Sequence, residues 1–168
     1  MEKQDVARWL CHYKLSKYHE DIEPYRGRED EFHKLFQPYE ILKGEDNCLL
    51  NTGIDEMWDL IIGVSSNYYN NANTQIGVGD SSTAANSTQT DLQAATNKTY
   101  KGMEAGYPTS TAQKATFKSS FGSSEANYTW NEWVVKQSTS AKCLNRKVES
   151  LGTKTSGTWT LEVTITLS

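Results

Sequence analysis

The carboxylate of Glu132 lies between two tryptophans in the sequence, a grouping that suggests sugar chemistry. Glycoside hydrolysis uses a pair of carboxylates, and tryptophan rings offer flat apolar surfaces beside them. The possible partners are Glu125, Glu149 and Glu162, and nothing in their context distinguishes one from another. We therefore favour a structural interpretation, in which Glu132 pairs with a base such as Arg146 or caps a strand edge.

Histidines and cysteines are the next residues that could carry chemistry. The histidines lie near the N-terminus and match no His-x-x-x-His or Cys/His metal pattern. The cysteines are odd in number and form no Cys-x-x-Cys pair, which favours reduced, partly buried thiols. These residues are His12, His19 and His33, and Cys11, Cys48 and Cys143.

Glycine and serine motifs are equally unspecific. The stretch from Gly77 to Gly79 lacks the third glycine of a dinucleotide site, and no Gly-Lys-Ser/Thr follows it. A strand end with a tight turn explains it better than a phosphate cradle. There is no Gly-x-Ser-x-Gly nucleophile context. We expect no enzymatic activity, no metal site and no cofactor.

The elements that would position these residues are strands. Residues 158–167 place Trp159, Leu161, Val163, Ile165 and Leu167 on one parity, with threonines and a glutamate on the other. Successive strand side chains point to opposite faces, so this segment predicts a strand with one apolar and one wet face.

Further strands are predicted over 74–78, 113–119, 128–135 and 143–148, separated by polar turns. Two short helices are predicted over 29–36 and 52–63. This order favours a mainly β fold, an antiparallel β-sandwich or jelly-roll-like domain, over a parallel α/β sheet.

Composition divides the chain. Residues 1–60 hold 14 acidic and 8 basic residues and only two Ser/Thr, whereas the remainder is rich in Ser and Thr. Residues 2–20 fit a helix or a strand, and we favour the strand.

We predict an acidic, extended N-terminal arm over 1–46 and a β-sandwich domain over 47–168. The aromatic residues expected to anchor the arm on a partner are Trp9, Tyr13, Tyr18, Tyr25, Phe36 and Tyr39.

Net charge and hydropathy limit the partners. The formal net charge is −4, which does not favour nucleic acid or an anionic membrane. No apolar run approaches the roughly 18–20 residues of a membrane span. The polar N-terminus has no apolar signal core, so we expect synthesis and assembly in the cytoplasm.

Five parts of the chain, spread loosely over residues 47–168, carry a resemblance to a known family. They are Asn47–Gly53, Ile76–Asp80 with Thr90–Leu92, Glu125–Trp133, Leu144–Arg146 and the Thr-rich closing strand. Together they resemble small virion proteins of tailed bacteriophages.

Two kinds of virion protein share features with the chain. The pieces Gly77–Asp80 with Asp91–Leu92, and Trp130–Trp133, are similar to the collar part of tail fibres. The plan of an arm before a β-domain is similar to head decoration (cement) proteins. The resemblance implies no catalysis, repeated copies and usually trimers, with the major capsid protein as partner.

Three functions follow as hypotheses. The first is a decoration protein of the virion that binds across joints between major capsid subunits and stabilises the head. The second is a tail, neck or collar-fibre component. The third is a carbohydrate-binding module that stacks sugars on Tyr128, Trp130 and Trp133. With Trp159, these aromatic residues are expected in the core or on the surface of the β-domain.

Overall fold

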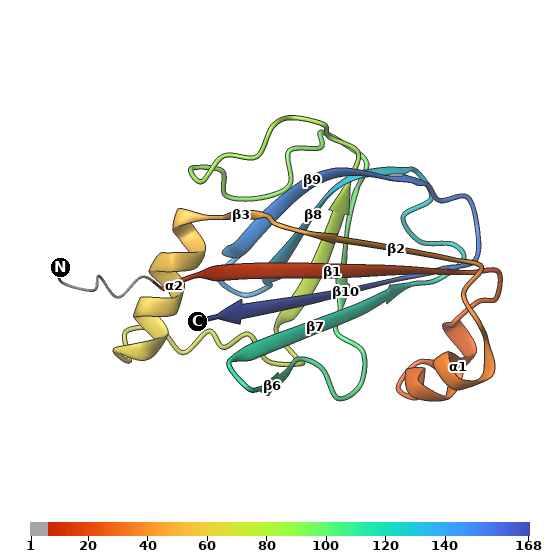
Figure 1. Cartoon of the computed structure of the whole chain (residues 1–168), viewed down its shortest axis with the longest axis horizontal. Helices are drawn as coiled ribbons and strands as arrows, with labels where there is room; N and C mark the ends of the chain where they lie inside the picture. The colour runs from red at the N-terminus through yellow and green to blue at the C-terminus, as the bar shows by residue number, and fades with distance from the viewer. Residues whose placement is uncertain (1–6) are drawn as a thin grey trace, which may run out of the picture.

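The computed structural model describes residues 7–168, which form two five-stranded antiparallel sheets packed face to face (Figure 1). In spatial order, the first sheet contains β2 (Glu40–Glu45), β1 (Trp9–Tyr18), β10 (Thr158–Leu167), β7 (Lys114–Phe121) and β6 (Thr109–Thr111). The second contains β3 (Cys48–Leu49), β9 (Cys143–Thr153), β8 (Thr129–Gln137), β4 (Thr74–Gly79) and β5 (Lys98–Gly102). The predicted β-sandwich is confirmed.

Two α-helices lie at opposite ends of the sandwich, α1 (Glu29–Leu35) after β1 and α2 (Asn51–Ile61) after β3 (Figure 1). A single 3-10 turn, η1 (Glu23–Tyr25), precedes α1. Both helices coincide closely with the predicted ones.

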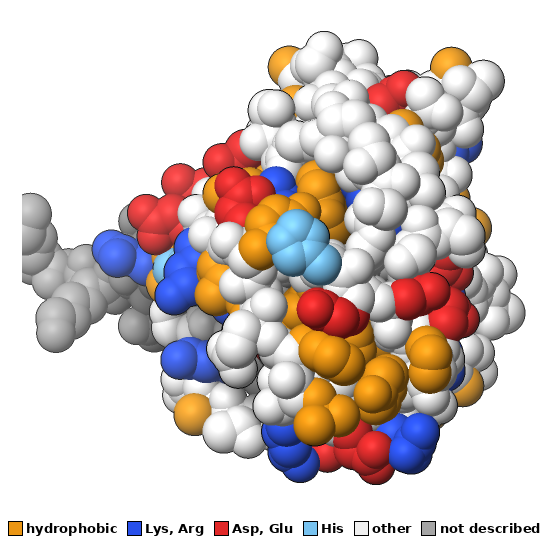
Figure 2. All heavy atoms as spheres, turned by 90° about the vertical axis from the view of Figure 1, so that its right-hand side faces the viewer, with side chains coloured by type: hydrophobic (Ala, Val, Ile, Leu, Met, Phe, Trp, Pro, Cys, Tyr) orange, Lys and Arg blue, Asp and Glu red, His pale blue; other side chains and the backbone are white. Residues whose placement is uncertain are grey.

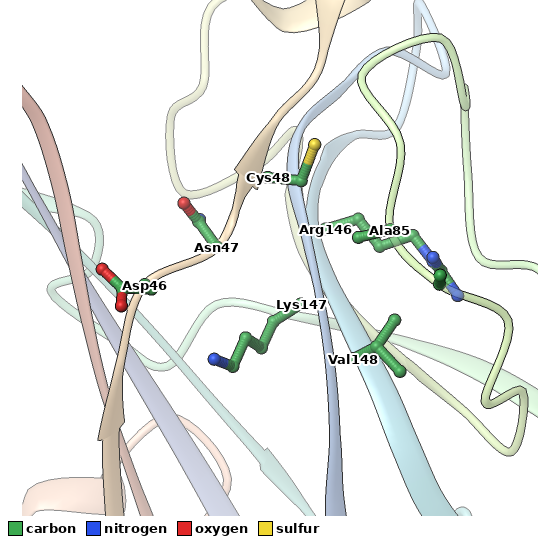
Figure 3. Close-up of a pocket in the computed structure, with 8 residues that line it drawn as sticks. Asp46, Asn47, Cys48, Ala85, Arg146, Lys147 and Val148 are labelled. Carbon is green, nitrogen blue, oxygen red and sulfur yellow. The ribbon is translucent and has the colours of Figure 1, made fainter.

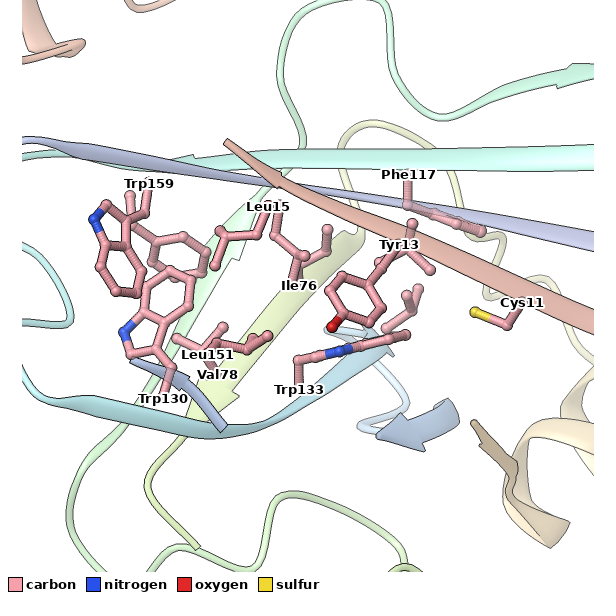
Figure 4. Close-up of a cluster of buried hydrophobic side chains, with 14 of the residues drawn as sticks. Cys11, Tyr13, Leu15, Ile76, Val78, Phe117, Trp130, Trp133, Leu151 and Trp159 are labelled. Carbon is pink, nitrogen blue, oxygen red and sulfur yellow. The ribbon is translucent and has the colours of Figure 1, made fainter. Parts of the chain in front are cut away.

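The closing strand β10 runs through the middle of the first sheet. Its inward side chains Trp159, Leu161 and Val163 are all 3% exposed or less. They meet the inward residues of β8 and β4, so the two sheets share one apolar core (Figure 4). Leu167 is the exception on this parity, because it lies at the open end of the sandwich and is 52% exposed.

The predicted N-terminal arm is wrong for residues 7–46. Strand β1 pairs with β10 along its whole length, from Trp9 opposite Leu167 to Tyr18 opposite Thr158. Strand β2 then pairs with the outer edge of β1. The acidic composition misled the prediction, because most of the acidic residues lie in the segment between the two strands and not in the strands themselves. The one buried charge of β1, Lys17, pairs with Glu40 of β2 at 2.6 Å. The strand alternative for residues 2–20 is confirmed over 9–18.

The segment between β1 and β2, residues 19–39, covers part of the face of β10 that was expected to be wet. The backbone N–H of Ile22 donates to the Thr158 hydroxyl at 2.9 Å, and Thr160 hydrogen-bonds to Ser120. Thr158 and Thr160 are therefore buried, whereas Thr164 and Thr166 further along stay partly exposed. This segment is an integral part of the domain.

Candidate functional site

Glu132 and Arg146 form the ion pair that the sequence suggested. Arg146 Nη2 and Nε both lie 2.7 Å from Glu132 Oε2, and both side chains are fully buried. The carboxylate also accepts the backbone N–H groups of Gln93 and Ala94 at 2.9 and 2.7 Å. Its hydrogen-bonding capacity is thus used within the protein, and it fastens the loop after β4 to the second sheet.

The remaining donors of Arg146 reach the same loop, at Gln89 Oε1 and the Thr83 carbonyl, both at 2.9 Å. A hollow of about 430 Å³ adjoins this arginine, between the segment before β3 and the tip of the loop (Figure 3). Arg146 is fully buried and its charge is paired with Glu132, which argues against its use as an anchor for an anionic ligand in this hollow.

The glycines at 77 and 79 make room for side chains instead of a phosphate. A Cβ on Gly79 would lie 2.5 Å from Glu132 Oε1, and one on Gly77 would lie 2.7 Å from the Tyr100 ring. Both glycines are therefore explained by close packing within the sheet.

The predicted sugar platforms are buried. Trp130 and Trp133 have no exposed surface, and Trp130 packs edge-to-face on Trp159 with ring centroids 4.9 Å apart (Figure 4). Tyr128 is half-buried, and its hydroxyl donates to the Val78 carbonyl at 3.1 Å. These rings fill the core, so a carbohydrate module built on them is ruled out.

The predicted partner anchors hold the chain to itself. Tyr13 and Tyr18 are buried, and Tyr18 joins Phe32 and Ile22 in a small cluster beneath α1. Tyr25 and Phe36 pack on that cluster, and Trp9 packs on the main core. Tyr39 alone among the six is mostly exposed, at 51%. It stacks on His19 with ring centroids 4.3 Å apart.

His33 belongs to a buried polar network that ties α1 to the first sheet. Its Nδ1 lies 3.1 Å from the Tyr18 hydroxyl and its Nε2 lies 2.9 Å from Glu104 Oε1. Lys118 also contacts Glu104, at 3.2 Å. Burial alone would raise the pKa of Glu104, but the hydrogen bond from His33 and the charge of Lys118 outweigh it and lower that pKa.

The two buried thiols, Cys11 and Cys143, have no reactive environment. Burial raises the pKa of Cys11 to about 12 and also raises the pKa of Cys143, so both stay protonated. Among residues 7–168, no cluster of three or more metal-ligating side chains occurs.

The most unusual feature of the surface lies on α2 and the loop after it. Five large apolar side chains point to solvent there, and we call them the α2 apolar surface. Monomeric proteins rarely expose such a group of neighbours, and one usually marks an interaction site. Its members are Trp58 (60% exposed), Ile61 (72%), Ile62 (68%), Val64 (72%) and Tyr68 (58%).

The helix presents these residues because its inner side is occupied by Gly53 and Glu56. Gly53 lies so close to β9 that a Cβ there would be 2.6 Å from Leu144 Cα. Glu56 is fully buried, pairs with Lys142 Nζ at 2.6 Å and accepts the Ser65 hydroxyl at 2.5 Å. A charged residue therefore faces inward while a tryptophan faces outward. The sequence pattern that grouped Ile54, Met57, Trp58 and Ile61 could not indicate this orientation.

An apolar groove opens beside this surface at the same end of the sandwich. Two adjoining hollows of about 610 and 340 Å³ share Tyr69, Ala115 and Phe117. The smaller one continues to Met57 of α2 and to the exposed Leu167 at the end of β10. Groove and α2 apolar surface together make this end of the molecule suitable for binding another protein.

The inward carboxylate makes the position of α2 dependent on pH. Burial alone would raise the pKa of Glu56, but Lys142 and Ser65 outweigh it and lower the pKa. A lowered pKa in the folded state gives stability that is present above the ordinary carboxyl range and is lost as the pH falls through the lowered value.

We therefore expect α2 to loosen as the pH falls below the ordinary carboxyl range, and Glu56→Gln to loosen it at neutral pH as well. Protease cleavage after Trp58 and Leu60 reports this loosening. The exposed ion pair of Asp30 and Lys34 supplies the control, because Asp30→Asn should leave cleavage in α2 unchanged. Equal cleavage of wild type and Glu56→Gln at neutral pH would contradict the role of this anchor.

The opposite end of the molecule carries a smaller mixed surface. Figure 2 shows hydrophobic side chains beside acidic and basic ones on the face at the α1 end. The large exposed apolar residues in this region are Leu35 (64%), Tyr39 (51%) and Ile41 (49%). Charged side chains are mixed with the apolar ones on this face, so this surface is less continuously apolar than that of α2 (Figure 2).

Comparison with known proteins finds no match to this chain among protein-family models, curated proteins or solved structures. Within residues 7–168, no helix is both long and apolar enough to span a bilayer.

Proposed function

We propose that this chain is a structural, non-enzymatic protein of a tailed-phage virion. In this proposal it is a head decoration protein that binds across joints between major capsid subunits and stabilises the shell. The observation that carries it is the α2 apolar surface, whose exposed Trp58, Ile61 and Ile62 are costly to leave in water. Trp and Tyr are also residue types that dominate binding energy at interfaces.

The location of the contact differs from the one that the sequence suggested. Residues 7–46 are part of the sandwich domain, so in this proposal they do not supply the attachment as a flexible arm. A rigid domain with one apolar end attaches without ordering a long segment, and this lowers the entropic cost of binding.

The polar clusters support a structural role over a catalytic one. Glu132, Arg146 and Glu104 are buried and engaged with partners inside the protein. These charges therefore hold loops and α1 in place. Repeated, trimeric copies, as the resemblance implies, would let several weak contacts act together on one lattice.

Purified particles of the phage that encodes this chain provide the test. We expect the chain in them at a fixed ratio to the major capsid protein, measured by quantitative mass spectrometry. After heads and tails are separated, it should remain with the heads. Recovery with the tails would favour the neck or collar assignment, and absence from the particles would exclude a virion protein.

A further inference from the structure

Lys154, directly after β9, has an environment that is unusual for a lysine. Lys154 is only 1% exposed. Its ammonium donates to the Gly122 carbonyl at 2.7 Å and to Asn127 Oδ1 at 2.8 Å. Within residues 7–168, no carboxylate forms an ion pair with it, although Glu125 and Asp21 lie near enough to act on it. Fully buried lysines are rare unless they are paired, because a lone charge loses its hydration.

A strained turn directly before Asn127 fixes the backbone that carries this side chain next to the Lys154 amine. Ala126 has a φ of +52°, a region that residues with a Cβ seldom adopt, and its carbonyl accepts the Tyr128 N–H at 2.9 Å. The backbone N–H of Lys154 donates to the Tyr128 carbonyl at 3.1 Å, so both sides of the contact are fixed. Strained backbone of this kind occurs preferentially at functional positions.

The amide of Asn127 has a buried side and an exposed side. Its oxygen accepts from the buried amine, while its nitrogen donates to the Ser123 carbonyl at 2.9 Å in an exposed position. A nucleophile therefore approaches from the interior, and a leaving group on nitrogen departs toward solvent.

We propose that Lys154 and Asn127 join in an intramolecular isopeptide bond. In this step the neutral amine Nζ attacks Asn127 Cγ, the new C–N bond forms and the Cγ–Nδ2 bond breaks. The proton released from Nζ passes to Nδ2, which leaves as ammonia. No oxidant, reductant or cofactor is consumed. The inference is independent of the proposed virion role.

Two properties of the site favour the reaction. Burial lowers the pKa of Lys154 to about 8, so a larger fraction of the amine is neutral and nucleophilic near neutral pH than for an ordinary lysine. The two groups are also held in contact, which replaces a bimolecular encounter by an intramolecular one with a high effective concentration. Formation of the bond removes the buried positive charge of Lys154. It also links Asn127, just before β8, to Lys154, just after β9.

Intact-mass spectrometry of the purified full-length chain tests the bond. After incubation at a pH above 8, we expect a mass lower than that of the sequence by one ammonia. Proteolysis should then yield one branched peptide that contains both Lys154 and Asn127. Asn127→Ala and Lys154→Met should each keep the full mass of their sequences.

The control distinguishes this bond from the cyclisation of an asparagine on its own backbone, which also releases ammonia. That loss would persist in Lys154→Met and would give no branched peptide. Asn97→Ala, at another exposed asparagine, should retain the loss of ammonia. A wild-type chain at full mass after this incubation, or a loss that persists in Lys154→Met, would overturn the proposal.

Discussion

Glu132→Gln is expected to lower the free energy of unfolding by about 3–5 kcal/mol, the range for removing one partner of a buried ion pair. The substitution keeps the size of the side chain but leaves the guanidinium of Arg146 buried without a counter-charge. It also weakens the acceptor for Gln93 and Ala94, so the loop after β4 loses its main attachment. Urea unfolding followed by tryptophan fluorescence measures the effect, because Trp130, Trp133 and Trp159 are all buried.

A partly exposed pair in the same sheet provides the control. Lys147 and Glu149 lie 3.6 Å apart, and their side chains are 19% and 40% exposed. Glu149→Gln should change stability by less than about 1 kcal/mol. Adding Arg146→Met to Glu132→Gln should recover part of the loss, since an apolar replacement leaves no buried charge. If Glu132→Gln cost no more than Glu149→Gln, the loop would not depend on this pair.

The strands were predictable because alternation of apolar residues is a local signal. Residues 158–167 read as a strand without any tertiary information, and so did most of β7 and β8. The pairing of Glu132 with Arg146 was also suggested correctly, since a charge inside an alternating strand needs a partner.

The edge strand β2 was missed for a physical reason. Its sequence, Glu-Ile-Leu-Lys-Gly-Glu, carries the charges that protect an exposed sheet edge, and such composition resembles a loop. The same charges made residues 1–46 resemble an arm. The pairing of β1 with β10, a contact between residues far apart in the sequence, shows otherwise.

The candidate site could not be located from the sequence because periodicity places residues on a face without saying what the face meets. Trp58 and Ile61 share a helical face in either orientation. The orientation of α2 is set by Gly53 and Glu56, which contact β9 and Lys142. These partners are distant from α2 in the sequence, so the local pattern does not include them. Conversely, the aromatic residues that looked available, such as Trp130 and Tyr13, fill the core.

The second large effect is expected at the α2 apolar surface. Ile61→Asp should weaken binding to capsid shells by at least ~30-fold, because central apolar residues of an interface contribute about 2 kcal/mol or more. Trp58→Ala should act similarly. Ile61 is 72% exposed, so its replacement should leave the free energy of unfolding nearly unchanged. Loss of binding would then reflect the surface itself.

Leu35→Asp is the matched control for Ile61→Asp. Leu35 is also a helical aliphatic residue, 64% exposed, but it ends α1 at the opposite end of the sandwich (Figure 1). Under the proposed attachment, this variant should bind shells as wild type does.

The most direct test of the attachment is co-sedimentation with empty heads of the encoding phage that were assembled without this chain. Wild type and Leu35→Asp should saturate the shells at the same concentration, whereas Ile61→Asp and Trp58→Ala should remain in the supernatant. If Ile61→Asp and Trp58→Ala saturate the shells as wild type does, the α2 apolar surface is not the attachment site.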